Sequence, residues 1–245
     1  MATLLRPTIH RAHLSFHYRE AGAAAPAWWQ ELFWVGIAAV ATFAVTAVFS
    51  GVLELSRGWF VLVYAVVTLP IVIDYVVWSG IDLRALFVQN WRWGVAGAIA
   101  VSAFLMMSVQ RQDGSARPEG LRLIWDLIWL GVVYGLVDAL ILSVLPVLAT
   151  WRAFSSHGWT GTLAGKIGVG ALAVAASLIV ATAYHIGYTE YRNGDIVNPI
   201  IGNGVMSVGY VLTSNPITVI ASHIVMHVTA VLHGAETTVQ LPPHY

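Results

Sequence analysis

Apolar residues recur along this chain in uninterrupted stretches that are long enough to cross a bilayer. Residues 32–53, 93–110 and 167–189 contain no Asp, Glu, Lys or Arg. An α-helix of about 20 apolar residues spans the hydrocarbon core of a membrane. Each of these stretches therefore predicts one transmembrane helix.

Two further apolar stretches carry a single acid each. Residues 59–79 include Asp74, and residues 127–150 include Asp138. Both stretches are long enough to span, so they raise the predicted number of transmembrane helices to five. One alternative is that residues 121–130 form a separate interfacial helix in front of the fourth span.

The last apolar stretch is long enough for two helices. Residues 196–235 contain no Asp, Glu, Lys or Arg, and their only basic side chains are histidines. The break is predicted at Thr-Ser-Asn-Pro, residues 213–216, because Ser214 or Asn215 can cap a helix and Pro216 fits its first turn. The sequence thus predicts an all-α, polytopic transmembrane helix bundle of about seven spans.

Composition supports an integral, multi-pass membrane protein whose surroundings are the lipid bilayer. Hydrophobic residues make up 58% of the 245 residues, charged residues 10%, and the mean hydropathy is +0.74. The net charge is zero, which gives no indication of a nucleic-acid partner. There is no cysteine, so disulfides and thiol chemistry are excluded.

The polar residues divide the chain unevenly. Most of the Asp, His and Asn side chains within the apolar stretches lie after about residue 121. We therefore expect four parts: a polar N-terminal arm (1–30), a three-span scaffold half (31–120), a four-span working half (121–235) and a C-terminal tail (236–245). The fifth span is rich in Gly and Ala, which predicts a central position in the bundle. Asn198-Pro199 and residues 202–204 predict a broken sixth span that lines a cavity.

The orientation in the membrane follows from the distribution of basic residues. Seven of the twelve Lys and Arg residues lie on the side of the N-terminus. The positive-inside tendency then favours a cytoplasmic N-terminus.

Candidate chemistry centres on histidines and one acid within the last four spans. His223 and His227 are one helical turn apart and so share a helix face. Asp138 lies mid-span, and His185 lies near the end of the fifth span. Ionisable side chains are costly inside a bilayer and usually face a bundle interior or a wet cavity. We therefore expect Asp138, His185, His223 and His227 to form the site.

Several uses of these residues remain open from the residues alone. Asp138 and His185 can each be structural, as a hydrogen-bonded acid and as a helix-capping histidine. Imidazoles four residues apart can bind a divalent transition metal or a haem through His185, His223 and His227. The histidines can also stabilise an oxyanion.

The order of these residues resembles the CPBP intramembrane proteases, which include the CAAX prenyl endopeptidases and bacteriocin-processing relatives. That family carries Glu-Glu-x-x-x-Arg in one span, Phe-x-x-x-His at the end of the next, then a span broken by small residues, then His-x-x-x-Asn. The corresponding segments here are residues 137–142, 181–185 and 223–227, within a resemblance that covers residues 131–234. Residues 202–214, followed by Asn215-Pro216, match the broken span and its end.

The resemblance implies a peptidase that activates water with an acid and a histidine. Carried over by position, Asp138 would be the base with His185 as its partner, and His223 and His227 would bind the oxyanion. The chain departs from the family pattern at Val137, Leu142, Ala181 and His227, where the family has Glu, Arg, Phe and Asn. A non-catalytic relative that binds a membrane peptide, a partner helix or a lipid is the alternative, and a metal-binding or haem-binding protein is the third.

Overall fold

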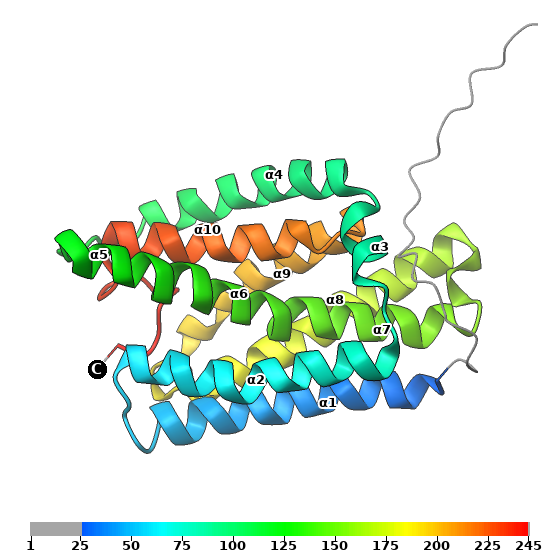
Figure 1. Cartoon of the computed structure of the whole chain (residues 1–245), viewed down its shortest axis with the longest axis horizontal. Helices are drawn as coiled ribbons and strands as arrows, with labels where there is room; N and C mark the ends of the chain where they lie inside the picture. The colour runs from blue at the N-terminus through cyan, green and yellow to red at the C-terminus, as the bar shows by residue number, and fades with distance from the viewer. Residues whose placement is uncertain (1–25, 245) are drawn as a thin grey trace, which may run out of the picture.

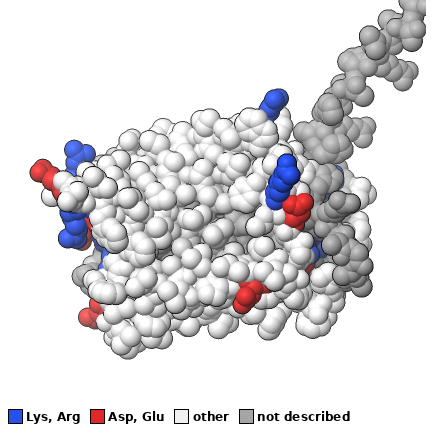
Figure 2. All heavy atoms as spheres, viewed as in Figure 1, with Lys and Arg blue, Asp and Glu red and all other residues white. Residues whose placement is uncertain are grey.

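The computed structural model describes residues 26–244 as a bundle of helices, with no β-strand in that range. Seven helices are long and apolar enough to cross a membrane, and they lie side by side along the long axis (Figure 1). Charged side chains gather mainly at the two ends of the bundle and leave its broad side almost uncharged (Figure 2). The predictions of an all-α bundle of about seven spans and of an integral, multi-pass membrane protein are confirmed.

The seven spans, in chain order, are α1 (Trp28–Val45) with a π-helical end (Thr46–Ser50), α2 (Arg57–Ser79), α4 (Trp91–Gln110), a composite fourth span, α8 (Leu163–Gly187), α9 (Val197–Thr213) and α10 (Ile217–Gly234). The fourth span consists of α5 (Gly120–Asp126), a π-helical segment (Leu127–Val133), α6 (Tyr134–Asp138), a second π-helical segment (Ala139–Val144) and α7 (Leu145–Ser155). The short helix α3 (Leu83–Val88) and 3-10 turns at Trp159–Gly161, Thr189–Tyr191 and Gly194–Ile196 lie in the connections.

The composite fourth span is the most buried of the seven. It runs without a break over 36 residues, so the alternative of a separate helix at 121–130 is wrong. Its most apolar window is 78% buried, against 44% for α8, so the prediction that the glycine-rich fifth span is the central one is also wrong. The reason is that two of the fourth span's own glycines, Gly131 and Gly135, lie directly against the α10 backbone.

The boundary between the last two spans lies where the sequence predicts it. Ser214 has a positive φ of 51°, and the backbone N–H of Ile217, the first residue of α10, donates to Asn215 Oδ1 at 2.9 Å. The predicted break inside the sixth span is wrong, because α9 is one uninterrupted helix. Pro199 lies in its first turn, where the missing N–H has no intrahelical partner to lose.

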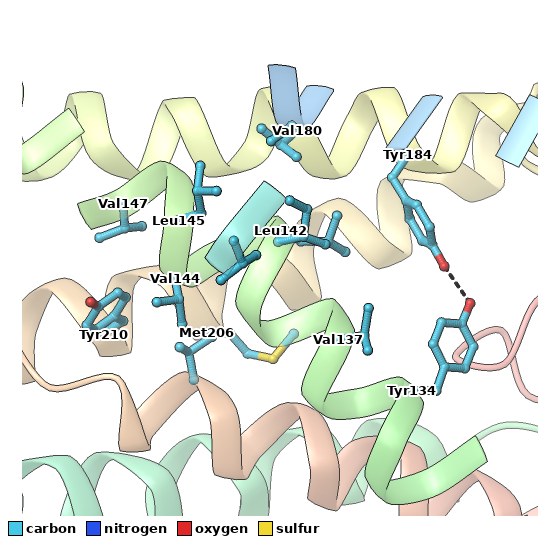
Figure 3. Packing of buried hydrophobic residues seen from close by; sticks show 14 of the residues in the cluster. Tyr134, Val137, Leu142, Val144, Leu145, Val147, Val180, Tyr184, Met206 and Tyr210 are labelled. Carbon is cyan, nitrogen blue, oxygen red and sulfur yellow. Dashed lines mark hydrogen bonds between the residues drawn. The ribbon is translucent and has the colours of Figure 1, made fainter. Parts of the chain in front are cut away.

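The first three spans and the last four form one bundle. Helix α1 packs against α7 and α8, and α4 packs against α9 and α10. Between α6 and α8, apolar side chains such as Val137, Leu142 and Val180 fill the interior (Figure 3). Most of the predicted polar arm, residues 1–25, lies outside the described residues.

Candidate functional site

A cavity of about 350 Å³ lies inside the bundle, near the end where the C-terminus lies in Figure 1. Its walls come from five helices, Leu142 of the second π-helical segment, Arg111 and Gln112 after α4, and the C-terminal tail. From α4 it is lined by Phe104, Leu105 and Ser108, from α6 by Tyr134 and Asp138, from α8 by Tyr184 and His185, from α9 by Ile201, Asn203 and Met206, from α10 by His223, Met226 and His227, and from the tail by Val239, Gln240 and Pro242. Phe104 and Ile201 are also exposed on the outer surface, so the cavity wall between α4 and α9 continues to the face that lipid would cover.

All four residues predicted to form the site line this cavity. Asp138, His185, His223 and His227 are 5%, 8%, 2% and 1% exposed. His185 lies near the end of α8, whereas His223 and His227 lie in the middle of α10. They line one space because the cavity extends inward along α8 and α10 from the loops at this end.

The central contact is a hydrogen bond between Asp138 and His227. Oδ2 of Asp138 lies 3.1 Å from Nε2 of His227. Asp138 is the last residue of α6 and lies between the two π-helical segments, which are rare in proteins and occur often at functional sites. The Asp138 carboxylate also faces the Tyr64 hydroxyl of α2. His227 Nδ1 is buried and has no hydrogen-bond partner within residues 26–244, so the imidazole is the member of the pair that the protein leaves incompletely satisfied.

Two glycines allow this contact. A Cβ at Gly131 would lie 2.8 Å from the Val228 side chain, and a Cβ at Gly135 would lie 2.9 Å from Ile224 Cα. Because neither glycine carries a side chain, the fourth span approaches α10 closely, and Asp138, one turn further on, reaches His227. The four-residue spacing of these glycines is the sequence signal that would have identified this interface.

The other two histidines have a defined tautomer when neutral. His185 Nδ1 lies 2.7 Å from Ala181 O, and His223 Nδ1 lies 3.1 Å from Val219 O. A carbonyl only accepts, so each Nδ1 is the donor and each Nε2 is left as an acceptor. The histidine that is hydrogen-bonded to Asp138 is His227, whereas the family pattern led us to expect His185. A neutral His223 in this tautomer also lacks the free N–H that oxyanion binding would require.

Two tyrosines, Tyr134 and Tyr184, line the cavity, and a third, Tyr188, is hydrogen-bonded to them. The Tyr134 and Tyr184 hydroxyls are hydrogen-bonded to each other between α6 and α8 (Figure 3), and Tyr188 donates to Tyr184 at 2.7 Å. The Tyr134 hydroxyl donates in turn to the carbonyl of Pro242 at 3.3 Å, and its ring packs on His227. Sequence reasoning assigned these tyrosines no role, although Tyr134 precedes Asp138 by one turn, as Tyr184 precedes Tyr188.

The C-terminal tail closes the cavity at the loop end. Leu241 is fully buried, and the carbonyl of Val239 accepts a hydrogen bond from the Tyr191 hydroxyl. Burial raises the pKa of Tyr191 well above its usual value, with the nearby Glu190 adding to the effect, so the phenol stays protonated and remains a donor. His244 continues the attachment through Glu190, with Nδ1 to Oε2 at 2.9 Å.

A second polar cluster lies beside the cavity. Asn203 accepts from Ser143 and donates to Ser177, both at 2.9 Å, and Ser177 contacts Ser207 at 2.7 Å. These contacts connect the fourth span with α8 and α9, and they satisfy both ends of the Asn203 amide. We interpret this cluster as a structural connection between helices that also fixes one wall of the cavity.

The arrangement gives the predicted metal site no geometric support. No group of three or more His, Asp or Glu side chains that could hold a metal ion occurs among the residues that the structure describes. His185, His223 and His227 line one cavity, but they do not form such a group.

Comparison with known proteins does not identify the chain. No protein-family model, no curated protein and no solved structure matches it. The resemblance to the CPBP proteases accordingly stays a prediction from the motifs.

Proposed function

We propose that this protein is an intramembrane peptidase of the CPBP type, in which Asp138 and His227 activate a water molecule. The observation that carries the proposal is the Asp138–His227 hydrogen bond in the wall of a cavity within the bundle. A carboxylate that accepts the N–H of a neutral imidazole fixes its tautomer and orientation and leaves the other ring nitrogen as a base.

The roles differ from those that the family pattern implies for each position. Nδ1 of His227, which has no partner in the described part of the chain, takes a proton from water. The resulting hydroxide adds to the scissile carbonyl carbon, the C–N bond breaks, and the leaving amine takes the proton back from His227. Asp138 keeps Nε2–H in place and stabilises the imidazolium that forms.

Peptide is the favoured substrate class because a peptide segment of the chain itself already forms one wall of the cavity. Residues of the tail line it, and the Tyr134 hydroxyl donates to the Pro242 carbonyl. A substrate that displaces the tail would offer its own carbonyl to this donor, and a developing oxyanion would strengthen that bond. Tyr134 then takes the oxyanion role that the family assigns to its last motif.

Binding without hydrolysis is the second candidate. The observation in its favour is Leu142, which is 2% exposed at the position where the family has an arginine. An apolar side chain there cannot pair with the acid, and the cavity keeps apolar residues such as Met206 and Met226 on its walls. A partner helix or lipid chain would fit such a surface.

The two candidates are separated by reconstituting the protein in liposomes with a library of tagged single-span peptides and identifying cut products by mass spectrometry. We expect cleavage by the natural chain and a loss of about 10²–10⁴-fold in Asp138→Asn. Asp74→Asn is the matched control, because Asp74 is also a membrane-span acid but lies exposed on α2 outside the cavity. Library peptides that bind but stay intact would favour the second candidate.

We also propose that the N-terminal end of the bundle faces the cytoplasm. Support comes from the excess of Lys and Arg on that side, seven of twelve. The cavity would then open toward the opposite face. Because the chain has no cysteine, a single Ser115→Cys variant reports the side directly through an impermeant thiol reagent applied to intact cells. Labelling only after permeabilisation would reverse the orientation.

A further inference from the structure

A second hollow, separate from the cavity that Asp138 and His227 line, lies at the same end of the bundle. This groove has a volume of about 1000 Å³ and is formed where α2 and the fourth span begin, with the loop before α5 and the C-terminal tail as its other walls. The tail divides the two spaces, because Pro242 lines the cavity and Pro243 lines the groove.

Three tryptophans line the groove at the level where two spans start. Trp59 is 65% exposed and Trp125 57% exposed, and Trp125 stacks on Trp129 with ring centroids 5.8 Å apart. The Trp129 indole donates to the Gly58 carbonyl at 3.0 Å, which fixes its orientation. Indole rings in such positions are typical of the membrane–water boundary, where lipid headgroups lie.

Three arginines line the same groove, and the acids there do not use up their donors. Arg122 pairs with Asp126 at 3.3 Å, and Arg57 pairs with Glu236 at 3.4 Å. Arg117 makes no ion pair within the described residues. Three guanidiniums against two carboxylates leave the groove with an excess of one positive charge.

Arg57 is the arginine whose geometry points most directly to a missing acceptor. Its side chain is 11% exposed, and one amino group donates to the Pro243 carbonyl at 3.1 Å. Its Nε is buried with no hydrogen-bond partner in the described chain. A buried guanidinium N–H without an acceptor is costly, and an oxyanion in the groove would satisfy it.

We propose that this groove binds the phosphodiester of an anionic phospholipid headgroup. One phosphodiester charge would neutralise the excess positive charge, and the guanidinium fork matches the geometry of phosphate oxygens. The tryptophans fix the depth of the headgroup at the boundary, and its acyl chains extend along the apolar outer face of the bundle. The site does not depend on the proposed peptidase activity.

The test compares lipids on the purified protein by native mass spectrometry. The probes are phosphatidylglycerol and phosphatidylcholine with the same acyl chains. We expect the natural chain to retain phosphatidylglycerol preferentially. In the double variant Arg117→Gln/Arg122→Gln we expect the affinity for phosphatidylglycerol to fall about 25-fold, because each basic residue near a membrane surface contributes about fivefold. The matched control is Arg84→Gln/Arg92→Gln, which removes the same charge at the opposite end and should leave retention unchanged.

Three outcomes would overturn the proposal. Equal retention of the two lipids by the natural chain would overturn the proposal without any variant. The experiment therefore remains decisive even if the double variant fails to fold. An equal loss in the Arg84/Arg92 control would show that bulk surface charge, not the groove, binds the lipid. Displacement of phosphatidylglycerol by millimolar inorganic phosphate would identify a soluble phosphate as the ligand instead.

Discussion

Two buried acid–base pairs cross this bundle, and they differ in how completely the protein satisfies them. Glu31 of α1 accepts from Arg152 Nε at 2.8 Å and from the Tyr75 hydroxyl at 2.9 Å, so both of its oxygens have partners. Arg152 also donates to the Ser79 carbonyl. In contrast, His227 Nδ1 finds no partner among residues 26–244, the Asp138 carboxylate has only the Tyr64 hydroxyl besides His227, and this pair borders a cavity.

This difference indicates different uses for the two pairs. A fully hydrogen-bonded buried ion pair has no free atom to offer a ligand, and its role is to hold α1, α2 and α7 in place. An incompletely satisfied pair beside a cavity keeps an acceptor for water or substrate, and here that acceptor is His227 Nδ1. We therefore interpret Glu31–Arg152 as structural and Asp138–His227 as the candidate site.

The largest expected change in stability is at the structural pair. Arg152→Gln leaves the Glu31 carboxylate buried without its cation, and we expect a loss of about 3–5 kcal/mol in the free energy of unfolding. Denaturant unfolding in detergent micelles measures it. The control is Arg84→Gln, an exposed arginine at the same end, for which a change within about 0.5 kcal/mol is expected. Similar values for the two variants would contradict the structural role.

The next largest change is at the glycine contact that brings the candidate pair together. In Gly135→Ala the new methyl group meets the α10 backbone, Ile224 Cα at 2.9 Å and His223 O at 3.0 Å. Because backbone has to move, we expect a loss of about 1–3 kcal/mol together with loss of the Asp138–His227 hydrogen bond. Unfolding and the His227 imidazole NMR signals report these two effects separately.

Gly168→Ala on α8 is the matched control for that substitution. A Cβ there meets nothing within 4 Å, so the same chemical change should leave stability unchanged or slightly raised. If Gly135→Ala behaves like this control, then close packing against α10 does not hold the candidate pair in place.

The smallest expected effect is at the tail that closes the cavity. Tyr191→Phe removes the donor to the Val239 carbonyl, which is worth about 0.5–1.5 kcal/mol. We expect faster hydrogen exchange at the Leu241 amide, with exchange in α1 unchanged, because only the tail is released. Unchanged exchange at Leu241 would mean that other contacts keep the cavity closed.

The sequence predicts the spans well because bilayer thickness imposes a length on every apolar stretch. It also predicts that Asp138, His185, His223 and His227 line one space, because ionisable side chains avoid lipid. The partner of Asp138 could not be predicted, because it depends on the close approach of Gly135 to α10, a distance that residue spacing alone does not determine. The pair Glu31–Arg152 was missed for a similar reason, since its members are 121 residues apart.

The most direct test measures cleavage per folded molecule in Asp138→Asn and Glu31→Gln side by side. We expect Asp138→Asn to stay folded, within about 1 kcal/mol of the natural chain, and to lose cleavage by about 10²–10⁴-fold. Glu31→Gln should lose several kcal/mol of stability, while the fraction that remains folded cleaves at the natural rate. Equal loss of folding in both variants, or unimpaired cleavage by Asp138→Asn, would contradict the assignment of Asp138–His227 as the site.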